Sequence, residues 1–118
     1  MIVIGGGVIG LEMGSVYARL GTEVTVIQHG PRICPFLDAE IATVFMKSLK
    51  KQGIKFELNS AVEGGVNNKE NGVTVNIKNA KGEIKALDTD ICLVSIGRHA
   101  FTGGLDLDKA GLETNKRG

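Results

Sequence analysis

The first half of the chain alternates between short apolar runs and stretches with helical spacing. Apolar and β-branched residues at 2–4, 23–27 and 54–58 predict three strands. Between them, apolar and small residues recur at helical spacing over 8–20, and a second helical pattern covers 39–52. The order strand, helix, strand, helix, strand predicts a βαβαβ unit around a parallel sheet.

Both predicted helices carry terminal signals. Gly21 and Gly53 follow the helical patterns at the position where a left-handed residue ends a helix, and Asp38 is placed to cap the start of the second helix. The apolar positions that recur along the first helix are Ile9, Met13, Val16, Tyr17 and Leu20. The predicted buried face of the second helix consists of Ile41, Val44, Phe45, Ser48 and Leu49.

The pattern changes in the second half of the chain. Short strand candidates at 61–66, 73–77 and 83–87 are joined by short connections that contain glycine, which favours antiparallel hairpins. The middle candidate alternates apolar and polar residues, as in a sheet with one face in water. A small meander therefore takes the place of a further crossover helix.

A continuous apolar run at 90–96 predicts a buried central strand. The last twenty residues have a loop-like pattern, and we expect Leu105, Leu107 and Leu112 to anchor them. We therefore predict a single α/β domain over residues 1–118. Its fold is a Rossmann-like βαβαβ parallel sheet with a three-stranded antiparallel β-meander on one face.

Composition and charge narrow the class of protein. The 118 residues suffice for one domain with its own core, and an apolar fraction of 42% is ordinary for a globular chain. Fourteen basic and thirteen acidic residues leave a net charge of +1, far from the basic stripe of a nucleic-acid binder. No apolar run reaches the roughly 18–20 residues of a membrane span. The first residues open directly into a strand, so we expect no targeting peptide, no membrane segment and no nucleic-acid partner.

The cysteines and histidines do not suggest a metal or a nucleophile site. Cys92 lies in an apolar run and is interpreted as a small core residue, whereas Cys34 lies in a proline-flanked loop, where we expect an exposed thiol. A disulfide between two such distant cysteines is not expected. His29 and His99 have no partners at metal spacing, and no nucleophile–base pair indicates hydrolysis. We assign neither a metal ligand nor a catalytic residue to this chain.

A glycine motif suited to a dinucleotide follows the first predicted strand. Gly5, Gly7 and Gly10 form G-x-G-x-x-G, and Gly14 extends the motif. Gly5 permits the tight turn, Gly7 lets phosphate groups approach the backbone, and the last two glycines let the helix pack closely on the sheet. The free N–H groups and positive dipole end of the helix then face an anion. Because the motif follows a strand, opens a helix and leads into a second strand, we predict a dinucleotide site rather than an ordinary glycine-rich turn.

With this motif in place, the chain resembles the pyridine-nucleotide domain of the flavoprotein disulfide reductases, and within that family the dihydrolipoamide dehydrogenases. The stretches that carry the resemblance are 3–16, 20–26, 51–56, 93–98, 101–105 and 109–112. Together they cover essentially the whole chain.

The resemblance implies a complete enzyme that is an FAD-dependent homodimer. Such an enzyme oxidises dihydrolipoyl groups on partners in 2-oxoacid dehydrogenase and glycine-cleavage complexes, and it passes the electrons through a redox disulfide and FAD to NAD. The FAD-binding half, the C-x-x-x-x-C pair and the interface domain are not in this chain. We therefore expect a domain excised from a larger reductase that binds NAD(H) but does not turn over lipoamide. The implied compartment is the mitochondrial matrix for a eukaryotic source and the cytoplasm for a bacterial one.

The resemblance also implies cofactor-binding roles for individual residues. Those implied to line the pyrophosphate and adjacent ribose are Gly5, Gly6, Gly7, Val8, Ile9 and Gly10. Glu12, expected in the first helical turn where the dipole favours an acid, is implied to reach the nicotinamide. Val62 is implied to lie against the adenine, although packing within the meander explains this valine equally well. Gly97 is implied to let the nicotinamide half approach the backbone, and Arg98 either holds the cofactor or flavin domain or is a surface cation.

Gln28 departs from the family pattern. The residue at the end of the second strand is usually an acid that accepts hydrogen bonds from the adenosine ribose hydroxyls and repels a 2′-phosphate. Gln28 can bond both hydroxyls through its donor and acceptor ends. It cannot repel a phosphate, and the nearby His29 and Arg32 favour one. We place NAD ahead of NADP on the overall resemblance.

Two other functions stay open. One is a free-standing NAD(P)-binding sensor module, and the other is the NADPH domain of a glutathione-reductase-like enzyme, whose relatives also act on trypanothione or mercuric ion. A domain of a larger enzyme should expose apolar residues that meet the other domains, whereas a free-standing module should be polar there.

Overall fold

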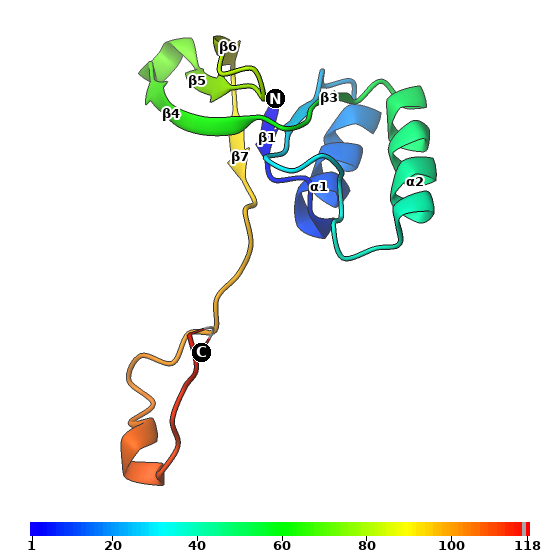
Figure 1. Cartoon of the computed structure of the whole chain (residues 1–118). Coiled ribbons are helices and arrows are strands. Elements are labelled where there is room, and N and C mark those ends of the chain that lie inside the picture. The colour runs from blue at the N-terminus through cyan, green and yellow to red at the C-terminus, as the bar shows by residue number, and fades with distance from the viewer. Residues whose placement is uncertain (117) are drawn as a thin grey trace.

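A computed structural model describes residues 1–116 and 118, which form two packed sheets, two helices and an extended tail (Figure 1). The parallel sheet contains β1 (Ile2–Ile4), β2 (Thr25–Ile27), β3 (Lys55–Glu57) and β7 (Cys92–Val94), in the order β3-β2-β1-β7. Helix α1 (Val8–Arg19) connects β1 to β2, and α2 (Ala39–Lys51) connects β2 to β3.

The antiparallel sheet contains β4 (Ala61–Asn67), β5 (Val73–Lys78) and β6 (Ile84–Thr89), paired in chain order. Two short 3-10 turns, at Lys69–Asn71 and Leu107–Ala110, complete the described elements. The parallel sheet with helices and the separate three-stranded meander confirm the predicted fold class.

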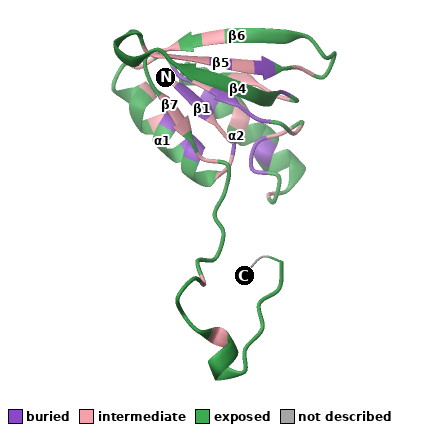
Figure 2. Cartoon of the chain, turned by 90° about the vertical axis from the view of Figure 1, so that its left-hand side faces the viewer, coloured by how far each residue is buried: buried purple, intermediate pink, exposed green. Residues whose placement is uncertain are grey.

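The parallel sheet buries side chains on both faces. Successive strand residues point to opposite sides, so Val3 of β1 is buried together with Leu11 of α1. Ile2 packs on the other side with Val75 and Ile77 of β5. Figure 2 shows the helices on one side of the sheet and the meander on the other, with the buried residues between them.

The predicted helix ends are confirmed. The Asp38 carboxylate accepts a hydrogen bond from the Glu40 N–H at 2.8 Å, which caps α2. Gly21 and Gly53 follow the two helices with φ of +93° and +90°. Glycine adopts this left-handed conformation without the steric cost that a Cβ would bring.

The predicted close packing of α1 through its glycines is confirmed, whereas the buried face of α2 differs from the predicted one. In α1 the sheet contacts Gly10, Leu11 and Gly14, because the glycines let the helix backbone approach the strands. The apolar side chains that are exposed instead are Ile9, Met13, Val16, Tyr17 and Leu20. In α2 the buried residues are Ala42 and Leu49. The prediction was right for Leu49 and wrong for the exposed Ile41, Val44, Phe45 and Ser48.

The carboxy-terminal third is less buried than predicted. Strand β7 lies at the edge of the described sheet, next to β1, so Val94 is 63% exposed and the prediction of a buried central strand was wrong. The residues after β7 extend away from both sheets (Figures 1 and 2). Leu105 and Leu112 are 60% and 59% exposed, so they do not anchor this segment, and only Leu107 is half-buried.

Candidate functional site

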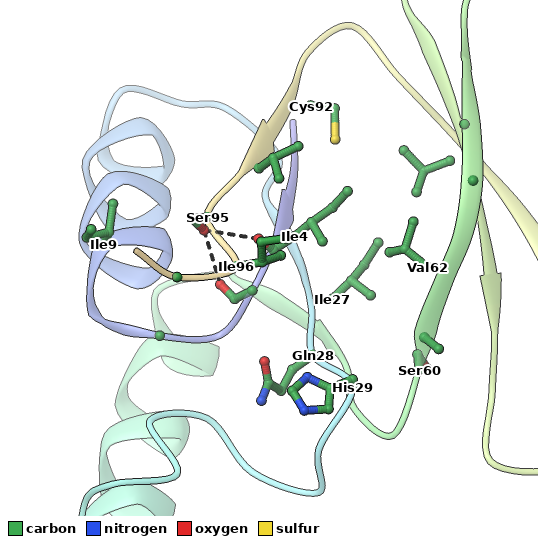
Figure 3. A pocket seen from close by; sticks show the side chains of 18 of the residues that line it. Ile4, Ile9, Ile27, Gln28, His29, Ser60, Val62, Cys92, Ser95 and Ile96 are labelled. Atoms are coloured by element: carbon green, nitrogen blue, oxygen red, sulfur yellow. Dashed lines mark hydrogen bonds between the residues drawn. The ribbon is translucent and has the colours of Figure 1, made fainter. Parts of the chain in front are cut away.

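A cavity of about 1110 Å³ opens at the carboxyl ends of β1, β2 and β7 (Figure 3). One wall includes Ile4, Ile27 and Val94 of the parallel sheet, and the facing wall includes Val62 of β4. Doubly wound sheets bind their ligands outside the carboxyl ends of the strands. The cavity therefore lies where this type of fold receives a nucleotide.

The glycine loop forms one end of the cavity. Gly5 follows β1 with a φ of +108°, and a Cβ there would overlap the carbonyl oxygen of Ser95. Gly7 caps the start of α1, lines the cavity and has no heavy atom within 4 Å of the place where a Cβ would lie. The first N–H groups of a helix have no intrahelical partner and carry the positive end of its dipole. The space beside Gly7 can therefore receive an anion such as a pyrophosphate.

Gly6 and Gly10 support the loop and do not line the cavity. Gly10 is buried, and a Cβ there would overlap the Gly5 carbonyl oxygen and lie 2.5 Å from Ser95 Oγ. Helix α1 thus crosses the end of β1 at a distance that requires glycine. A Cβ at Gly14 would make only an ordinary contact, 3.4 Å from Val24 Cγ1.

Gln28 is turned inward against the glycine loop. It is 5% exposed, and its Oε1 accepts a hydrogen bond from the Gly6 N–H at 2.9 Å. Its backbone is held on both sides, because the Gln28 N–H donates to the Glu57 carbonyl and the Gln28 carbonyl accepts from the Ser60 N–H. A backbone N–H can bond only to the oxygen of the amide. The oxygen therefore faces the loop, and the expectation that both ends of Gln28 meet the ribose does not hold in this structure.

The remaining predicted residues divide between the cavity and its surroundings. Besides Gly5, Gly7 and Gln28, the predicted residues that line the cavity are Val8, Ile9, His29, Val62, Gly97 and Arg98. Gly97 has a φ of +133°, which favours glycine at this position, three residues beyond the end of β7. Glu12 is exposed and does not line the cavity. Helix α1 begins at Val8 and has no acid in its first turn, so the prediction that Glu12 lies there was wrong.

Of the two basic residues in the loop after β2, Arg32 and His29, one lines the cavity. Arg32 donates from Nη2 to the Pro35 carbonyl at 3.0 Å and does not line the cavity. His29 does line it, beside Gln28 (Figure 3). The loop therefore presents an imidazole rather than a guanidinium to a ligand.

Ser95 belongs to the site, although the sequence-based prediction assigned it no role. Its N–H donates to the Ile4 carbonyl at 2.8 Å. Its hydroxyl lies 3.1 Å from the same oxygen and 3.4 Å from the Gly5 carbonyl oxygen (Figure 3). The signal in the sequence was a serine inside an otherwise apolar run.

Both free cysteines are at least partly buried, and Cys92 packs against the core cluster of Ile2, Ile27, Val75 and Ile77. Cys34 is 2% exposed and packs in the core beneath α1 and α2, and its N–H donates to the Gly6 carbonyl at 2.8 Å. The prediction of an exposed thiol was wrong, because the loop folds back under the glycine motif. Cys92 is half-buried and lines the cavity. Burial raises the pKa of both thiols above the ordinary value of 9.0, so both are poor nucleophiles at neutral pH.

Within residues 1–116 and 118, no group of three or more histidine, cysteine or acidic residues is arranged to hold a metal ion. In the same residues, no helix has the length and apolar character needed to cross a membrane.

Sequence comparison defines the class of protein to which this fold and cavity belong. The family model of the pyridine nucleotide-disulphide oxidoreductases matches residues 1–118, so the chain belongs to this family. Members are flavoprotein oxidoreductases that use FAD and NAD(P). The resemblance seen in the sequence is thereby confirmed.

Individual relatives narrow the similarity. The mitochondrial dihydrolipoyl dehydrogenase of Pisum sativum is 50% identical over 119 residues, which cover 100% of this chain and 24% of the relative. Dihydrolipoyl dehydrogenase 3 of Pseudomonas putida is 48% identical, with 100% of this chain and 25% of the relative covered. The chain thus spans about a quarter of the length of these relatives.

A solved structure supports the same fold and family. The flavoprotein disulfide reductase RclA from Escherichia coli superposes with a TM-score of 0.83 at 33% identity, covering 99% of this chain and 26% of that protein.

Proposed function

We propose that this chain is the NAD(H)-binding domain of a dihydrolipoamide dehydrogenase. The observation that carries the proposal is the glycine loop, in which Gly7 leaves the start of α1 open to the cavity. The similarity to dihydrolipoyl dehydrogenases along the whole chain supports the choice among family members. The chain spans about a quarter of the length of these relatives. The oxidation of dihydrolipoyl groups by a whole reductase is therefore proposed as well.

In this proposal the residues of the chain bind and orient the nucleotide. The N–H groups at the start of α1 bind the pyrophosphate, Val62 and His29 lie along the adenosine half, and Gly97 lies along the nicotinamide half. FAD, held by another domain, would supply hydride exchange with the nicotinamide and two-electron exchange with the thiols of a redox disulfide. Glu12 is proposed to approach the nicotinamide from the exposed side of α1. The chain contributes no nucleophile and no catalytic acid–base pair.

The apolar surface supports a domain of a larger enzyme over a free-standing sensor. Val16 and Leu20 of α1 and Ile96 after β7 are exposed large apolar side chains. A domain that works alone seldom exposes many such residues, because apolar surface in contact with water is unfavourable. In the proposed reductase these side chains would meet the other domains. The proposed partners of that reductase are a homodimer mate and the lipoyl domains of 2-oxoacid dehydrogenase or glycine-cleavage complexes.

The position of Arg32 supports NAD over NADP, whereas the uncharged Gln28 gives little discrimination between the two nucleotides. Arg32 bonds to the Pro35 carbonyl and does not line the cavity, so it does not favour a 2′-phosphate there. Gln28 carries no charge and directs its oxygen to Gly6, so it does not repel a phosphate either. We therefore expect NADH to bind more tightly than NADPH, by a smaller ratio than in a relative with an acid at this position.

Nucleotide titration of the 118-residue chain tests the proposal. We expect saturable one-to-one NADH binding by fluorescence, and no NADH production from dihydrolipoamide by the flavin-free chain. The control is Gly7→Val, whose side chain enters open cavity space on an extended backbone and should remove binding while preserving the circular dichroism spectrum. If the folded wild-type chain binds neither NADH nor NADPH, the proposed function is wrong.

A second titration tests the choice of nucleotide. Gln28→Glu should weaken NADPH binding at least about tenfold more than NADH binding, because a carboxylate beside a 2′-phosphate is repelled. Tighter binding of NADPH than of NADH by the wild-type chain would instead favour the NADPH domain of a glutathione-reductase-like enzyme. The uncharged side chain of Gln28 is the observation that favours this second candidate.

A further inference from the structure

The peptide bond between Gly5 and Gly6 is contacted at both of its polar groups by side chains. On one side the Gly6 N–H donates to Gln28 Oε1 at 2.9 Å, in a buried position. On the other side the Gly5 carbonyl oxygen lies 3.4 Å from the Ser95 hydroxyl. A trans peptide directs its C=O and N–H in opposite directions, so the two contacts act on opposite edges of the same plane.

The two side chains come from the strands on either side of β1. The sheet order is β3-β2-β1-β7, Gln28 directly follows β2, and Ser95 directly follows β7. The backbone at each position is also bonded to a neighbouring element: Gln28 N–H to the Glu57 carbonyl at 2.9 Å, and Ser95 N–H to the Ile4 carbonyl at 2.8 Å. Both side chains are therefore presented from fixed points of the sheet.

We propose that Gln28 and Ser95 are positioning residues that clamp the Gly5–Gly6 peptide and so hold the glycine loop in the conformation that receives the nucleotide pyrophosphate. Gly5 has a φ of +108°, and glycine has several other conformations of similar energy. Rotation of this peptide would redirect Gly7 and the start of α1, where the anion binds. The Gln28 hydrogen bond opposes that rotation on one edge. On the other edge it is opposed by the Ser95 hydroxyl, whose single proton is shared between the Ile4 carbonyl oxygen at 3.1 Å and the Gly5 carbonyl oxygen at 3.4 Å. Ser95 also lies against Gly10, where a Cβ would be 2.5 Å from its hydroxyl oxygen, so one side chain contacts both the turn and the helix.

The clamp formed by Gln28 and Ser95 depends on the proposed function in one respect, which is the identity of the ligand as a nucleotide. It makes a prediction that needs no ligand: the Gly6 N–H should be protected from hydrogen exchange, and Ser95→Ala should reduce that protection. Ser95 does not bond to the Gly6 N–H, so an effect there is transmitted through the groups that the Ser95 hydroxyl contacts, the Gly5 and Ile4 carbonyl oxygens. The loss of one hydrogen bond corresponds to about a three- to tenfold change in an equilibrium. We expect faster Gly6 exchange by about this factor, and a similar increase in the NADH dissociation constant.

The control variant is Thr89→Val. The Thr89 hydroxyl donates to the Ile91 carbonyl at 3.1 Å near the amino end of β7, away from the glycine loop. This variant removes a comparable hydroxyl–carbonyl bond and should leave Gly6 exchange and NADH binding unchanged. Gln28→Leu should remove the protection of Gly6, and Gln28→Glu, which keeps an acceptor oxygen, should restore it.

Exchange of the Ala42 amide, which bonds to the Asp38 carbonyl at 2.9 Å in α2, reports global opening. If Ser95→Ala speeds Gly6 and Ala42 exchange equally, Ser95 has a general structural role and the clamp is wrong. The clamp is also wrong if Gly6 exchange and the NADH dissociation constant both stay within twofold of the wild-type values. If the wild-type chain binds no nucleotide but the exchange effects are local, the proposed function fails while the clamp stands.

Discussion

Replacing Gly10 with alanine should separate the packing role of the glycine motif from its role in the cavity. A Cβ at Gly10 would overlap the Gly5 carbonyl oxygen, and it would lie 2.5 Å from Ser95 Oγ and 3.0 Å from Val3 Cγ1. The Gly5 oxygen is a backbone atom of the turn, so it cannot simply rotate away. Helix α1 must therefore move outward from β1.

The expected magnitude follows from two opposing effects. Overpacking of a buried site costs about 1–3 kcal/mol, and the cost should be near the upper value because a backbone oxygen is among the overlapping atoms. Alanine in a helix interior regains about 1 kcal/mol relative to glycine. We expect Gly10→Ala to lower the free energy of unfolding by about 2 kcal/mol and to weaken NADH binding at least about tenfold, since a displaced α1 no longer directs its N–H groups at the pyrophosphate.

Gly14→Ala is the matched control in the same helix. A Cβ there would lie 3.4 Å from Val24 Cγ1 and 3.7 Å from Val3 Cγ2, which are ordinary contacts. The gain in helix propensity should therefore dominate and raise the free energy of unfolding by about 0.5–1 kcal/mol. Urea unfolding of the three proteins, followed by circular dichroism, measures both changes. Equal stability of the two variants would refute the close approach of α1 to β1.

Two further predictions concern the helix cap and the buried thiol. Asp38→Ala should lower the free energy of unfolding by about 1 kcal/mol, because the bond to the Glu40 N–H is lost; Asp38→Asn should retain most of it, and an equal loss in both would contradict the capping role. The Cys34 pKa is raised above 9.0 by burial, so the unfolded state loses its proton first as the pH rises. Urea unfolding should therefore show a constant free energy of unfolding well below pH 9 and a decline above it. Cys34→Ala should reduce this decline. An unchanged decline in the variant would show that Cys34 is not its source.

The sequence was sufficient for the order of elements and for the location of the site. Strand and helix periodicities differ, so local patterns identified the βαβαβ unit and the meander. The glycine motif located the end of the sheet where the cavity opens, because Gly5 and Gly10 lie where a Cβ would overlap neighbouring atoms. The helix ends at Gly21 and Gly53 and the cap at Asp38 are equally local, and the structure contains all three.

Only the tertiary structure decided which surface each element buries. In α1 the glycine motif correctly placed Gly10 and Gly14 against the sheet, but the apolar residues surround most of the helix, so periodicity could not reveal which of them are exposed. The exposure of β7 depends on its place at the sheet edge, which is a property of strand order and not of its own sequence.

The same distinction applies to the site. Cys34 is buried because a loop folds under Gly6, and Gln28 turns inward because the Gly6 N–H needs an acceptor in a buried position. Ser95 meets Gly5 across 90 residues of sequence. The sequence by itself determined that a glycine-rich turn joins the first strand to the first helix, through the short-range steric needs of glycine. The tertiary structure decided which side chains hold that loop, because their partners come from neighbouring strands.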